Sequence, residues 1–67
     1  MMYQLFFVSE EQANTFIEEV NNLGYEWHPV HLYKGKPPYG PKEYTWILKY
    51  EADARSARKI HAFYMGS

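Results

Sequence analysis

Three histidines are the side chains in this sequence best suited to bind a metal ion or to transfer a proton. His28 and His31 lie three residues apart in a strand-like segment, so unbroken alternation would point their imidazoles to opposite faces. Glu26 shares a face with His28, but two ligands do not complete a tetrahedral site. His61 has no acidic neighbour one helical turn away. These positions predict ordinary solvent-facing histidines and no metal site.

Nucleophilic catalysis has equally little support in the residue pattern. Ser9 is accounted for as a helix cap, and Ser56 lies among alanine and arginine with no base at a suitable spacing. Gly35 and Gly40 belong to a proline-rich segment and not to a strand-to-helix turn, so they form no phosphate-binding loop. A domain this small also offers little depth for a pocket of about 300 Å³ or more. We therefore predict no enzyme and no cofactor.

The segment Lys34–Lys42 points instead to binding. It contains three prolines, two glycines, three lysines and Tyr39, and it is longer than the usual hairpin loop of about two to five residues. A tyrosine at the tip of a stiff, lysine-rich loop is a suitable anchor for a protein interface. The alternative is a surface loop with Tyr39 folded back on the sheet. The predicted partner-binding residues are Tyr33, Lys34, Lys36, Tyr39, Lys42 and Tyr44.

The net charge of −1 conceals a segregation of charge along the chain. Residues 1–33 carry five acids and no base, hence −5, whereas residues 34–67 carry seven bases and three acids, hence +4. One interpretation is that this segregation arises by chance, because each of the two helices carries the charges that suit its own dipole. The other is an acidic helix face opposite a basic surface. That basic surface would comprise Lys34, Lys36, Lys42, Lys49, Arg55, Arg58 and Lys59.

The secondary-structure pattern begins with a strand and a helix. Residues 3–8 are apolar on both faces, which indicates a central or covered strand. Ser9 and Gln12 form a capping box for a helix that ends at Gly24. The apolar stripe of this helix consists of Ala13, Phe16, Ile17, Val20 and Leu23.

Two strands and a second helix follow. Residues 25–33 and 43–51 are expected to pair as an antiparallel hairpin across the loop. Pro29 indicates a bulge that would bring Trp27, Val30 and Leu32 onto one side. Asp53 can cap the final helix, residues 54–64. The apolar stripe of that helix consists of Ala54, Ala57, Ile60 and Tyr64.

The resulting fold class is a single α+β domain over residues 1–67, in the order β-α-β-β-α, with its core in residues 3–50. A three-stranded mixed or antiparallel sheet has the first helix packed on one face. We expect the C-terminal helix, about residues 53–64, to cover the other face. If it does not, Tyr33, Tyr44, Tyr50 and Trp27 would form an exposed aromatic platform. The absence of cysteine leaves folding to core packing, to which thirteen aromatic residues contribute.

Two sequence stretches carry a resemblance to a known family. They are Leu23-Gly24-Tyr25-Glu26-Trp27, followed by Val30 and Leu32, and Tyr44-Thr-Trp-Ile-Leu-Lys-Tyr50. Over residues 3–50 the chain resembles a family of very small bacterial and phage proteins of unknown function. It lacks the glycine before the tryptophan and has Pro29 where an apolar residue is usual. Because every matched position is structural, the resemblance implies a β-α-β-β core and no activity.

These observations together favour a non-enzymatic protein-binding module, accessory or inhibitor-like, of the kind that phages and bacteria encode. Self-association as a homodimer is a second expectation, since so small a core gains from pairing across an edge or face. The alternative function is single-stranded nucleic-acid binding through the basic half, which would use Lys49, Arg55, Arg58 and Lys59. The apolar run Tyr3–Val8 is too short for a membrane span, so a cytoplasmic location is expected.

Overall fold

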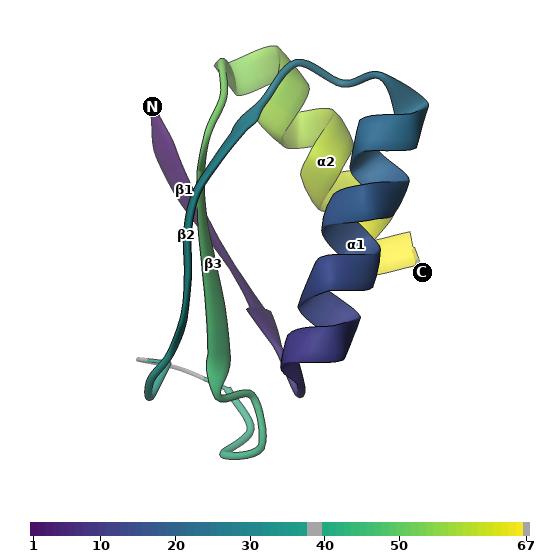
Figure 1. Cartoon of the computed structure of the whole chain (residues 1–67). Coiled ribbons are helices and arrows are strands. Elements are labelled where there is room, and N and C mark those ends of the chain that lie inside the picture. The colour runs from purple at the N-terminus through teal and green to yellow at the C-terminus, as the bar shows by residue number, and fades with distance from the viewer. Residues whose placement is uncertain (38–39, 67) are drawn as a thin grey trace.

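A computed structural model describes residues 1–37 and 40–66 of the chain. It has the predicted order β-α-β-β-α in one α+β domain, with a three-stranded sheet and two helices. Figure 1 shows two layers, the sheet on one side and both helices on the other. The elements are β1 (Met2–Phe7), α1 (Glu10–Leu23), β2 (His28–Lys34), β3 (Trp46–Glu51) and α2 (Ala54–Gly66).

The sheet is antiparallel throughout, with the strand order β1-β3-β2. The predicted hairpin of β2 and β3 is confirmed. Of the two predicted alternatives for the first strand, central or covered, the central one is wrong, because β3 is central and β1 lies at an edge. The apolar residues on both faces of β1 have two separate explanations. Leu5 and Phe7 face the helices, whereas Phe6 pairs with Ile47 on the opposite face.

The first helix begins and ends where the sequence predicts. The Ser9 hydroxyl accepts a hydrogen bond from the Gln12 amide at 3.1 Å, and Gly24 ends the helix with a left-handed φ of 78°. Phe16 and Val20 of its apolar stripe are buried. The stripe does not continue to Leu23, which is 50% exposed.

The bulge predicted at Pro29 is present in β2. Pro29 lies opposite Tyr50 and His31 opposite Lys49, which leaves Val30 as the extra residue. Trp27 is buried, and its indole N–H donates to the Asn21 side-chain oxygen at 2.8 Å. Val30 was expected to join the core side but is 56% exposed, because the bulge leaves it without a cross-strand partner.

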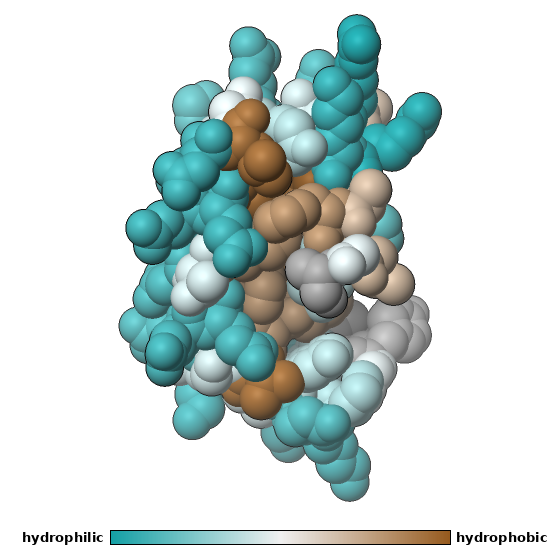
Figure 2. All heavy atoms as spheres, turned by 90° about the vertical axis from the view of Figure 1, so that its right-hand side faces the viewer, coloured by the Kyte–Doolittle hydropathy of each residue, from teal (hydrophilic) through white to brown (hydrophobic). Residues whose placement is uncertain are grey.

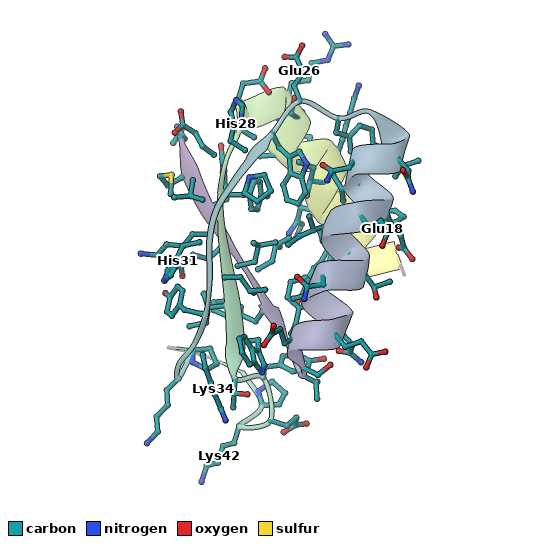
Figure 3. The ribbon with its side chains drawn as sticks, in the orientation of Figure 1. Glu18, Glu26, His28, His31, Lys34 and Lys42 are labelled. Atoms are coloured by element: carbon teal, nitrogen blue, oxygen red, sulfur yellow. The ribbon has the colours of Figure 1, made fainter. Side chains whose placement is uncertain are left out.

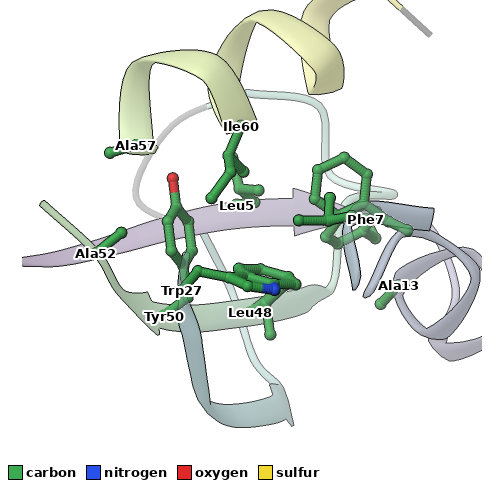
Figure 4. Packing of buried hydrophobic residues seen from close by; sticks show 11 residues of the cluster. Leu5, Phe7, Ala13, Trp27, Leu48, Tyr50, Ala52, Ala57 and Ile60 are labelled. Carbon is green, nitrogen blue, oxygen red and sulfur yellow. The ribbon is translucent and has the colours of Figure 1, made fainter. Parts of the chain in front are cut away.

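The C-terminal helix does not cover the second face of the sheet, so that expectation is wrong. Ala57 and Ile60 of α2 join the same core as Leu5, Leu48 and Tyr50, on the side of the sheet that also receives α1 (Figure 4). Alternation along the strands explains the choice. It sends Leu5 and Phe7 of β1 and Leu48 and Tyr50 of β3 to the helix side, and that area is more than one helix can cover.

The N-terminus of α2 provides a testable electrostatic contribution. Asp53 accepts a hydrogen bond from the Ser56 amide at 2.8 Å, and hydrogen bonds from Ser56 lower the pKa of Asp53. Because the pKa of Asp53 is lower in the folded protein than in the unfolded chain, the ionised cap stabilises the fold at pH values above the unfolded pKa of about 3.9. This stabilisation is lost as the pH falls through the lower pKa of the folded state. We expect Asp53→Asn, which retains capping ability, to reduce the fall in melting temperature between about pH 5 and pH 2, followed by circular dichroism.

The matched control is Glu43→Gln, which removes the same charge from an exposed position between β2 and β3. It should leave the acid dependence nearly unchanged. An acid dependence that is the same in Asp53→Asn as in the parent protein would contradict a stabilising role for the ionised cap.

Candidate partner-binding surfaces

The face of the sheet opposite the helices is the first candidate surface. We call it the uncovered sheet face, and the strand register defines its residues because cross-strand partners share a face. Three rows of residues cross it, from the loop end to the far end: Phe6, Ile47 and Tyr33; then Gln4, Lys49 and His31; then Met2, Glu51 and His28.

The first row of the uncovered sheet face is apolar. Ile47 is only 4% exposed although no helix covers it. Its neighbours account for this low exposure, because Gly35 packs closely against Ile47 and Tyr33. A Cβ atom placed on Gly35 would lie 3.4 Å from the Ile47 Cδ1 atom and 3.5 Å from the Tyr33 ring. Phe6 and Tyr33 flank Ile47 and are each half-buried. The row therefore presents two partly exposed rings around an aliphatic centre.

The second row adds cationic and polar groups beside these rings. The Lys49 ammonium lies 5.7 Å from the centroid of the Tyr33 ring, within reach of a cation–π interaction. The His31 ring stacks on Tyr33 with centroids 4.9 Å apart and planes inclined by 15°. Because of the bulge, His28 and His31 lie on the same face and not on opposite ones as unbroken alternation indicated. Figure 3 shows His31 pointing away from the helices.

The predicted partner-binding residues divide between two parts of the molecule. Tyr33 lies on the uncovered sheet face, and Lys34 and Lys42 are exposed at the end of the sheet where the loop leaves (Figure 3). Lys36 is exposed in the same loop, and Tyr39 lies outside the described residues. Tyr44 is separate from this group. It is half-buried and lines a groove with Tyr64 on the helix side.

The residues of the predicted nucleic-acid site do not form one surface. Lys49 lies on the uncovered sheet face, whereas Arg55, Arg58 and Lys59 are exposed on α2, against the opposite face. The predicted aromatic platform is wrong in composition. Trp27 and Tyr50 are 8% and 1% exposed and belong to the core beneath the helices. The basic half of the sequence is thus divided by the sheet.

A groove on the helix side is the second candidate surface, and we call it the helix-side groove. It is an open depression with a volume of about 880 Å³, larger than the size of the domain led us to expect. It lies between the end of β1, residues 11–19 of α1, Tyr44 and the C-terminal turns of α2. Its lining consists of Phe6, Phe7, Ser9, Glu11, Gln12, Thr15, Phe16, Glu19, Tyr44, Tyr64 and Met65.

Within residues 1–37 and 40–66, no three side chains among His, Cys, Asp and Glu come close enough together to hold a metal ion. No helix in this part of the chain is long and apolar enough to cross a membrane.

No family model, curated protein or solved structure matches the chain. The similarity to small bacterial and phage proteins therefore stays a prediction.

Proposed function

We propose that the chain is a non-enzymatic protein-binding module, and that the uncovered sheet face contacts an acidic, partly apolar surface of another protein. One observation supports this most directly: an apolar row extends across all three strands on a face that no helix covers. Partly exposed rings around an aliphatic centre are typical of protein interfaces, where tyrosine and phenylalanine bury large areas. An accessory or inhibitor role would follow from occupying a partner's surface.

The distribution of charge supports an acidic partner. Lys49 lies in the middle of the uncovered sheet face, and Lys36 and Lys42 are exposed in the segment that leaves the sheet at the loop end. The carboxylate of this face, Glu51, belongs to the last row at the far end. Such a gradient would orient a partner and accelerate encounter more than it would strengthen the final complex.

A pair of charge reversals tests the proposal. Lys49→Glu changes the uncovered sheet face, and Lys59→Glu makes the same change on the exposed side of α2. The parent protein and Lys59→Glu should capture the same partner from a lysate of the source cell, whereas Lys49→Glu should bind the purified partner at least about tenfold more weakly in calorimetry. Equal binding by both variants would remove the uncovered sheet face as the binding surface.

The same experiment separates the alternative function and self-association. Two results would favour single-stranded nucleic-acid binding and contradict the proposal. The captured material would be nucleic acid that disappears after nuclease treatment, and its affinity for the protein would fall steeply as the salt concentration rises. Analytical ultracentrifugation of the isolated protein tests the homodimer. A stable dimer that Lys49→Glu disrupts would assign the uncovered sheet face to a second copy of the chain and not to another protein.

A further inference from the structure

The helix-side groove has a floor of mutually packed aromatic rings. The Phe7 and Phe16 centroids are 5.3 Å apart, and Tyr64 meets both rings edge-on at 5.5 and 5.8 Å. Tyr44 is half-buried at the side of the same groove. Such rings present an apolar surface with electron-rich faces, which attract cations as well as aliphatic groups.

One wall of the helix-side groove is acidic. Glu11, Thr15 and Glu19 follow one another at intervals of four residues, so they form one ridge along α1. Both glutamates are exposed, and no lysine, arginine or histidine is among the described residues that line the groove. Figure 2 views this side of the molecule and shows apolar residues gathered in a band between hydrophilic flanks. The groove therefore combines an apolar floor with unbalanced negative charge.

We infer that the helix-side groove binds an extended basic segment of another protein, with two arginine or lysine side chains on either side of an apolar one. The two glutamates are eight residues apart in the helix, which corresponds to about 12 Å along its axis. In an extended chain, residues four apart are separated by about 13 Å and lie on the same face as the residue between them. The spacing of the acids thus matches basic residues at positions i and i+4 around an apolar residue at i+2.

This inference goes beyond the proposed function because the helix-side groove and the uncovered sheet face lie on opposite sides of the molecule. Charge complementarity selects the occupant. The groove carries two of the five acids of residues 1–33, Glu11 and Glu19, while the uncovered sheet face carries part of the basic half. A basic side chain of the bound segment that lies over the aromatic floor and beside one of the two glutamates would gain a cation–π interaction and an ion pair together, partly shielded from water.

Peptide titrations followed by amide NMR shifts test the inference. The capped peptide Arg-Thr-Leu-Thr-Arg should produce saturable shifts at residues 11–19 and 64–65. The peptide Glu-Thr-Leu-Thr-Glu should produce none. Glu11→Gln/Glu19→Gln should weaken binding of the basic peptide about five- to tenfold. The matched control, Glu10→Gln/Glu18→Gln, removes the same charge from exposed positions outside the groove and should bind as the parent protein does.

Several outcomes would overturn the inference. Equal weakening in both double variants would show general attraction to an acidic helix and no groove. The absence of saturable shifts at millimolar peptide would also contradict it. Concentration-dependent shifts of the same residues without any peptide would assign the groove to a second copy of this chain. Each result is independent of partner capture through Lys49, so the failure of one proposal is distinguishable from the failure of the other.

Discussion

Phe16→Ala is expected to remove most of the stability of this domain. Phe16 is 5% exposed, and its ring contacts four others: Phe7, Trp27, Phe63 and Tyr64, with centroids between 5.3 and 6.3 Å. Truncating a buried phenylalanine to alanine costs about 3–5 kcal/mol. A chain of 67 residues is expected to have a free energy of unfolding of about 3–10 kcal/mol. The substitution therefore removes a large fraction of the total.

The position of Phe16 explains why the loss should not be compensated locally. Its partners come from β1, the segment before β2, and α2, so the ring joins α1 to three other parts of the fold. Removing it takes away a contact that each of these parts makes with α1.

Urea unfolding followed by tryptophan fluorescence measures the effect, because Trp27 packs edge-on against Phe16. The control is Val30→Ala at a 56% exposed position, which should change stability by less than about 0.5 kcal/mol. A loss of less than about 1 kcal/mol in Phe16→Ala would mean that the aromatic cluster is not the centre of the core.

Local sequence signals predicted the elements and most of the core. Ser9, Gly24 and Asp53 are each recognisable because capping depends on a single residue and its immediate neighbours. The bulge at Pro29 is likewise a local effect of proline on strand pairing. These features need no knowledge of the tertiary structure.

The arrangement of the layers was not predictable in the same way. Which face receives α2 depends on how the two helices together cover the large residues of β1 and β3, and no local pattern encodes that. One available signal was Ile47, the single apolar residue out of phase in β3, which marks the uncovered sheet face. The helix-side groove depends on Tyr44, Tyr64 and Glu11 meeting from three distant segments, so sequence spacing could not reveal it.

The exposed edge of β1 leads to the second large expected effect. Met1 and Ala52 exchange two backbone hydrogen bonds of 3.2 Å, so alternation directs the backbone groups of Met2, Gln4 and Phe6 away from β3. An edge strand without charge or proline invites pairing with another chain. In this structure, the Tyr64 hydroxyl donates a hydrogen bond of 2.6 Å to the Phe6 carbonyl oxygen, so α2 caps part of that edge.

We expect Tyr64→Phe to lower the free energy of unfolding by about 1–2 kcal/mol, because it deprives a partly buried carbonyl of its donor. Burial raises the pKa of Tyr64, so the folded protein loses stability as pH rises from the unfolded value of about 10 through the higher folded value. Burial also raises the pKa of Tyr50, so the variant should retain part of this alkaline loss. Urea unfolding at pH 7 and pH 11 measures both effects.

Tyr33→Phe is the matched control for Tyr64→Phe, since the Tyr33 hydroxyl makes no hydrogen bond within the described residues. It should change stability by less than about 0.5 kcal/mol at pH 7. Hydrogen exchange adds a local measurement, because Tyr64→Phe should accelerate exchange of the β1 amides more than those of the central strand β3. If the variant also associates at high concentration while Tyr33→Phe does not, the Tyr64 hydroxyl protects the β1 edge against pairing. If Tyr64→Phe has the same free energy of unfolding and the same amide exchange rates in β1 as the parent protein, the hydrogen bond to Phe6 neither stabilises the fold nor protects the β1 edge.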